Sequence, residues 1–172
     1  MTLTFVTGGA RSGKSRYALR LAAATGAPVV VIATAEARDD EMRERIEAHR
    51  RERPAAWRTV EEPLDLVGAL RGLPAGEFAI VDCLSLWVSN LLEDEHDGEE
   101  IEQLAGEAAA LAAARAGGCV AVSNEVGMGI VPMGALSRSY RDLIGRVNAI
   151  WAEAADDAVL AVAGRVLRLE RA

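Results

Sequence analysis

The residues best suited to chemistry in this chain are a lysine and a serine that end a glycine-rich run. The run Gly8-Gly9-Ala10-Arg11-Ser12-Gly13-Lys14-Ser15 fits the phosphate-binding pattern G-x-x-x-x-G-K-[ST] at every position. Glycines let successive backbone N–H groups point at phosphate oxygens, and a helix that follows adds the partial positive charge of its N-terminus. We therefore predict that Lys14 contacts the β and γ phosphates of a nucleoside triphosphate and that Ser15 holds Mg²⁺.

The composition supports a special role for Lys14. The chain has 19 basic residues, and Lys14 is its only lysine, the others being arginines. A slim ammonium group fits between phosphate oxygens as a point charge, whereas a planar guanidinium does not fit the same geometry. The single lysine therefore stands where phosphate chemistry requires one.

The elements that must position this run are a strand before it and a helix after it. Residues 3–7 predict a strand and residues 14–24 a helix, which is the setting that the motif requires and that a chance glycine-rich turn would lack. Residues 29–34 form a continuous apolar run, typical of a buried parallel strand. The segment Ala33-Thr34-Ala35 is therefore expected at the same sheet edge as the glycine-rich run.

A carboxylate ends the next strong apolar strand. Residues 78–82 read Phe-Ala-Ile-Val-Asp, and an aspartate at the end of a strand beside a phosphate loop commonly holds magnesium. We therefore expect Asp82 and Ser15 to form one metal site.

Alternation of strands and helices predicts an α/β fold of the P-loop NTPase type, with a mostly parallel sheet flanked by helices. Further strands are expected at residues 57–61 and 119–123, and two at the end of the chain form a β-hairpin whose turn is predicted at Gly164-Arg165. Helices are expected at residues 39–51, 64–70, 84–92, 101–115 and 135–155. The acidic segment 93–100 is interpreted as a solvated, mobile connection.

The last of these helices has the most regular pattern. Its predicted core stripe consists of Leu136, Tyr140, Leu143, Val147, Ile150 and Ala154. The side predicted to face away from the core carries Arg138, Arg141, Gly145 and Asn148.

Composition limits the class of protein. A chain of 172 residues predicts one domain, residues 1–172, and its net charge of −7 argues against a general nucleic-acid or anionic-membrane surface. No apolar run approaches the roughly 20 residues of a membrane span, so a cytoplasmic protein is expected. Cys83 and Cys119 form no C-x-x-C pair and are interpreted as reduced, structural thiols.

Four separated stretches together resemble one family. They are Gly8 to Ser15, Ala48 to Trp57, Val81 to Trp87, and Asn124 to Pro132 with Gly145 to Asn148. The family is the bifunctional adenosylcobinamide kinase and adenosylcobinamide-phosphate guanylyltransferase, and the likeness covers essentially the whole chain. It implies phosphorylation of adenosylcobinamide with ATP or GTP, then transfer of GMP from GTP to give adenosylcobinamide-GDP during cobalamin synthesis. It also implies a homotrimer.

The resemblance further implies particular site residues. His49 matches the position that carries GMP covalently in the family, and imidazole is a suitable nucleophile near pH 7. The implied nucleotide contacts are Gly8 to Ser15, Ala33, Thr34, Ala35, Arg50, Arg51, Glu52, Arg53, Glu61 and Asp82. Apart from the resemblance, a lone histidine on the apolar side of a helix is more often structural.

Two other functions fit the residues less well. A simple P-loop kinase for a small metabolite would keep the roles of Lys14, Ser15 and Asp82 and leave His49 structural. A nucleotide-switched binding module is disfavoured because the sequence has no guanine-reading Asn-Lys-x-Asp run. The candidates for the base that activates the substrate hydroxyl are Asp82, Glu61 and Glu125. Of these, Asp82 is favoured as a metal ligand instead of a base.

Overall fold

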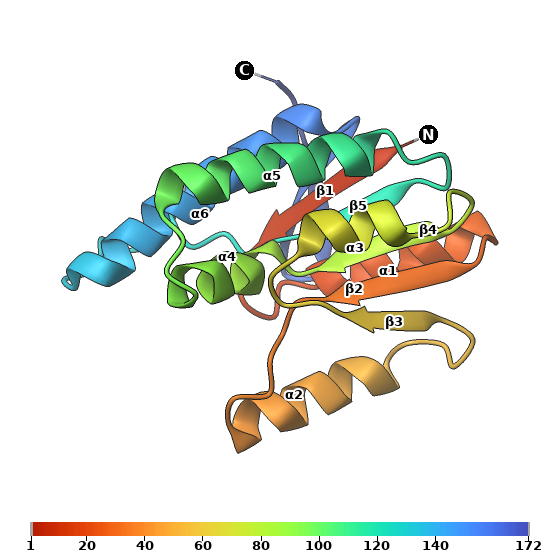
Figure 1. Ribbon diagram of the computed structural model, residues 1–172, viewed down its shortest axis with the longest axis horizontal. Helices are drawn as coiled ribbons and strands as arrows, with labels where there is room; N and C mark the ends of the chain where they lie inside the picture. The colour runs from red at the N-terminus through yellow and green to blue at the C-terminus, as the bar shows by residue number, and fades with distance from the viewer. Residues whose placement is uncertain (1, 172) are drawn as a thin grey trace.

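Seven strands form a single sheet in the computed structural model, which describes residues 2–171 (Figure 1). The strands are β1 (Leu3–Gly8), β2 (Val29–Ala33), β3 (Arg58–Glu61), β4 (Phe78–Asp82), β5 (Cys119–Val122), β6 (Asp157–Val162) and β7 (Arg165–Leu169). Their order across the sheet is β3-β2-β4-β5-β1-β6-β7. Only β7 runs antiparallel to its neighbour among these strands, which confirms the mostly parallel sheet with a C-terminal hairpin.

Helices cover both faces of the sheet. They are α1 (Lys14–Thr25), α2 (Asp40–Arg51), α3 (Leu66–Gly72), α4 (Leu84–Glu93), α5 (Gly98–Ala113) and α6 (Ala135–Ala154). Figure 1 shows α3 to α6 on one face and α1 on the other. Side chains alternate along β1 accordingly, because Leu3 and Phe5 pack with α3 to α6 while Val6 packs with α1.

The helix α2 is the exception, since none of its residues is buried. It lies beyond the β3 edge of the sheet in Figure 1. Asp39 caps its N-terminus by accepting a hydrogen bond from the Met42 N–H at 2.7 Å, and its last turn is basic. α2 therefore has no buried apolar face. It is stabilised by its N-terminal cap, by the favourable charge of its last turn, and by contacts at its C-terminal end.

Two predictions about local structure were wrong. The acidic segment is not simply a mobile connection, because Asp97 and Glu100 form a capping box that starts α5. The two-residue hairpin turn is Ala163-Gly164, one position earlier than predicted, with both residues at positive φ.

The predicted faces of α6 were also partly wrong. Leu136 is 77% exposed, because the first turn of α6 extends past the helices beside it (Figure 1). Asn148 is buried, because its Nδ2 donates to the Asn124 carbonyl at 3.1 Å. Leu143 and Val147 do pack into the core as predicted, so the stripe is correct in the middle of the helix.

Cys83 and Cys119 are both free and buried, as expected of structural thiols. Across residues 2–171, no helix has the length and apolar character needed to cross a membrane.

Candidate nucleotide site

The glycine-rich run forms a tight loop between β1 and α1. Gly13 precedes the helix with a φ of 98°, a conformation that glycine adopts without strain. The Lys14 ammonium group turns back to donate to the Gly9 carbonyl at 2.9 Å, and the Tyr17 N–H begins the helical ladder by donating to the Gly13 carbonyl at 3.0 Å. The helix N-terminus and the lysine therefore face the same space, where an anion is favoured.

Neighbouring strands support this loop from the C-terminal part of the chain. The Gly164 N–H, in the hairpin turn, donates to the Ser12 carbonyl at 2.8 Å. The Glu125 N–H, just after β5, donates to the Gly8 carbonyl at 3.1 Å. A Cβ on Gly8 would clash with the Ala161 carbonyl oxygen, so β6 packs directly against the start of the loop.

Lys14 lies in a partly desolvated position near both Arg45 and Asp82. Burial lowers the pKa of Lys14, the neighbouring Arg45 lowers it further, and the carboxylate of Asp82 opposes the shift. A bound phosphate would supply the counter-charge that this ammonium group requires.

The carboxylate of Asp82 stands at the end of β4 and pairs with Arg53. The Arg53 Nη2 donates to Asp82 Oδ2 at 3.2 Å, and the arginine side chain is only 8% exposed. Arg53 follows α2, so this ion pair ties the exposed helix to the centre of the sheet.

Behind Asp82, the backbone is fixed by Thr34. Thr34 Oγ1 donates to the Cys83 carbonyl at 2.7 Å and accepts from the Cys83 N–H at 2.9 Å. Thr34 is fully buried, so its hydroxyl joins the end of β2 to the end of β4 instead of facing solvent. Thr34 thus positions Asp82.

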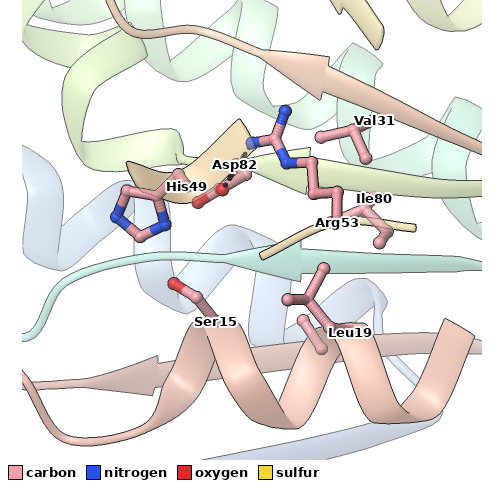
Figure 2. Close-up of a pocket in the computed structure, with 8 residues that line it drawn as sticks. Ser15, Leu19, Val31, His49, Arg53, Ile80 and Asp82 are labelled. Carbon is pink, nitrogen blue, oxygen red and sulfur yellow. Dashed lines mark hydrogen bonds and ion pairs between the residues drawn. The ribbon is translucent and has the colours of Figure 1, made fainter. Parts of the chain in front are cut away.

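His49 faces the same pocket as Ser15 and Asp82. Figure 2 shows the imidazole beside the Asp82 carboxylate, with Ser15 projecting from the first turn of α1 on the other side of the space. The apolar floor of the pocket comes from Ala18, Leu19, Val31 and Ile80. Three elements remote in sequence therefore place an imidazole, a hydroxyl and a carboxylate around one small cavity.

A larger open cleft surrounds this pocket. It is lined by most of the predicted site residues, namely Ala10, Arg11, Ser12, Gly13, Lys14, Ser15, Ala33, Ala35, His49, Arg50, Arg51, Glu52, Arg53, Glu61 and Asp82. Arg50 pairs with Glu61 across the cleft wall, joining α2 to β3. Gly8, Gly9 and Thr34 do not line the cleft, and Thr34 is buried behind it.

Arg45 and Asn124 also line the cleft and were missing from the predicted site. Arg45 stands four residues before His49, so helical spacing would have placed it on the same face of α2. Asn124 follows the apolar strand β5, between the strands that carry Asp82 and the glycine-rich loop. A polar residue after a buried parallel strand was the available signal.

The fold and the site together define a P-loop nucleotide-binding protein. A KaiC-like protein from Pyrococcus horikoshii has a similar fold, with a TM-score of 0.53 and 14% identity over 92% of this chain and 70% of that one. A second solved structure, of an ATPase domain, aligns with a TM-score of 0.50 and 13% identity, over 92% of this chain and 68% of that one.

Sequence comparison identifies the family. Residues 4–169 match the model of the CobU family, described as cobinamide kinase / cobinamide phosphate guanyltransferase, and the chain belongs to this family. The bifunctional adenosylcobalamin biosynthesis protein CobP of Pseudomonas aeruginosa is 47% identical over 96% of this chain and 95% of its own length. The bifunctional adenosylcobalamin biosynthesis protein CobU of Escherichia coli is 41% identical over 94% of this chain and 96% of its own length. Membership makes the chain a transferase and confirms the resemblance seen in the sequence.

Proposed function

We propose that this enzyme phosphorylates the side-chain hydroxyl of adenosylcobinamide with ATP or GTP and then transfers GMP from GTP onto the new phosphate. The observation that carries the proposal is the placement of His49 in one pocket with Ser15 and Asp82 (Figure 2). A plain kinase does not need a nucleophile there. A covalent guanylyl carrier does.

For the kinase step, the described residues supply binding and charge. Backbone N–H groups of the loop and the Lys14 ammonium group hold the β and γ phosphates, and Lys14 stabilises the charge on the transferring phosphoryl group. Ser15 and Asp82 offer oxygen atoms to the same pocket, which suits Mg²⁺, and these are the residues that would hold it. Bound magnesium would neutralise phosphate charge.

For the second step, an imidazole nitrogen of His49 attacks the α phosphorus of GTP. An N–P bond forms, the bond from the α phosphorus to the bridging oxygen breaks, and pyrophosphate leaves. A phosphate oxygen of adenosylcobinamide phosphate then attacks the same phosphorus, which breaks the N–P bond and frees His49. Arg50 and Arg53 stand in the cleft beside His49 and would balance the phosphate charges.

The test uses GTP labelled at the α phosphate. Wild-type protein with magnesium should take up label that is released by acid and retained in base, as a phosphoramidate requires, while γ-labelled GTP should give none by this route. The His49→Asn variant should lose the label and the guanylyl transfer but keep most of the phosphorylation of adenosylcobinamide. α2 buries no residue, so this change should leave the fold intact.

Two results would refute the covalent step: label in a folded His49→Asn protein, or no label in wild type. Label in the variant would mean that another residue carries GMP, and no label in wild type would mean direct transfer of GMP or a plain kinase. We also propose a homotrimer, as the resemblance implies. Sedimentation equilibrium of the purified protein measures its mass against that of the 18.2 kDa chain.

A further inference from the structure

The segment between β5 and α6 exposes an unusual density of large apolar side chains. Ile130 is 97% exposed, Met133 is 98% exposed and Met128 is 77% exposed. Val126, Val131 and Leu136 are also exposed, so residues 126–136 form what we call the apolar segment. Six exposed large apolar side chains within eleven residues suggest a binding site, whereas exposed apolar residues scattered singly do not.

Hydrogen bonds hold the backbone of the apolar segment. Arg138 Nη1 donates to the carbonyls of Pro132 at 3.1 Å and Met133 at 2.5 Å, and the Gly127 N–H donates to the Glu125 carboxylate at 2.5 Å. These bonds satisfy backbone groups while the apolar side chains stay in solvent. The segment therefore presents a prepared apolar surface.

This surface begins at the phosphate cleft. Asn124 lines the cleft, and the Glu125 N–H donates to the carbonyl of Gly8, the first residue of the phosphate loop. Met128 follows Glu125 by three residues, so their Cα atoms are at most about 10 Å apart. A ligand in contact with the apolar segment can thus extend a short polar side chain into the cleft.

The other exposed apolar residues lie on the C-terminal hairpin and are divided between the two faces of the sheet. In β7, Val166 points to one face, and Leu167 and Leu169 point to the other. The cleft itself is lined mainly by charged side chains. Neither region suits a bulky ligand with broad apolar faces.

We propose that the apolar segment, residues 126–136, binds the ring system of the corrinoid substrate, leaving its hydroxyl-bearing side chain to enter the cleft at Lys14. This inference rests on the proposed function. A corrinoid ring has two broad faces and amide groups around its rim, so apolar contact and backbone polar groups both suit it. None of these residues lines the cleft that holds the predicted nucleotide contacts.

The test compares two double variants of the full-length protein. Ile130→Gln/Met133→Gln alters the apolar segment, and Val162→Gln/Leu167→Gln alters two exposed apolar residues of the hairpin, 57% and 62% exposed, as the control. Binding of adenosylcobinamide is measured by ultrafiltration through its visible absorbance, and His49 labelling with α-labelled GTP is measured in parallel. The segment variant should bind adenosylcobinamide at least tenfold more weakly, with a raised KM for it, while its labelling stays at the wild-type level.

An unchanged dissociation constant for the corrinoid in the segment variant would overturn the inference. So would a lower sedimentation mass of that variant, because the segment would then be a contact between copies of the chain. Equal weakening in both double variants would also overturn it. If wild type binds no corrinoid at all, the proposed function fails instead, and that result is distinct from all three.

Discussion

Arg53 donates to Asp82 across 3.2 Å, and this pair connects the end of an exposed helix to the end of a central strand. The carboxylate is 20% exposed and the guanidinium 8%, so neither charge is well solvated without the other. The carboxylate that is proposed to hold magnesium is thus already balanced by an arginine. A bound magnesium ion and the Arg53 guanidinium must therefore share the Asp82 carboxylate or compete for it.

Asp82→Asn should shift the metal dependence of the kinase reaction. The amide oxygen can still accept a hydrogen bond from Arg53, so the fold should hold, but a neutral ligand binds Mg²⁺ more weakly. We expect the magnesium concentration for half-maximal phosphorylation to rise at least tenfold. Asp142→Asn, on the exposed side of α6, is the control and should leave the titration unchanged. A wild-type titration curve for Asp82→Asn would remove Asp82 from the metal site.

Lys14→Met should abolish phosphorylation without weakening the fold. The ammonium group is buried and partly desolvated, which lowers its pKa, so its removal takes an unfavourably placed charge out of the protein. Kinase turnover should fall by about 100-fold or more, since transition-state charge loses its cation. The Tm should not drop. Lys14→Arg should fail as well, because the guanidinium does not fit, and turnover within a few fold of wild type in either variant would contradict the assignment.

Gly8→Ala and Gly9→Ala should differ sharply in stability. A Cβ on Gly8 would clash with the Ala161 carbonyl oxygen and lie 2.8 Å from Ser12 Oγ, whereas a Cβ on Gly9 meets nothing within 4 Å. We expect Gly8→Ala to cost about 3 kcal/mol or more in free energy of unfolding, by backbone displacement, and Gly9→Ala less than about 1 kcal/mol. Urea denaturation measures both. Similar losses in the two variants would show that β6 does not restrict the loop.

Stability should decline in alkaline solution because of Cys119. Burial raises the pKa of this thiol from 9.0 to about 12 in the folded protein. The unfolded chain therefore releases the proton first as the pH rises, so stability is fully present below pH 9 and is lost progressively between pH 9 and 12. Cys119→Ala should reduce this slope by up to about 1.4 kcal/mol per pH unit. Denaturant titrations at several pH values measure the free energy of unfolding of both proteins. If Cys119→Ala leaves the slope of this free energy against pH unchanged, Cys119 is not the cause of the decline.

The strands were predictable because central parallel strands are buried on both faces and so read as continuous apolar runs. The strand Phe78–Asp82 was predicted at its observed bounds for this reason. Contacts between elements were not predictable in the same way. Thr34 looked like a nucleotide ligand at a strand end, but its hydroxyl is used twice by the backbone of Cys83. Only the spatial neighbour decides between the two roles.

For His49, spacing alone favoured a structural histidine, and the resemblance favoured a nucleophile. The structure leaves His49 half-buried, in a pocket that holds Ser15 and Asp82 above an apolar floor, and its role as a nucleophile stays a prediction. Its neighbours in the pocket come from α1 and β4, and nothing in the local sequence of α2 encodes them.

The position of β1 in the sheet affects how the enzyme is made on the ribosome. β1 pairs only with β5 and β6, and the carbonyl of Ser12 accepts its hydrogen bond from Gly164 near the end of the chain. The ribosome synthesises β1 before β5 and β6, so β1 cannot pair until residues more than 100 positions later have been made. The nucleotide-binding loop is thus synthesised before the strands that complete its surroundings, and we expect a nascent chain that ends before the hairpin to gain less stability from bound nucleotide.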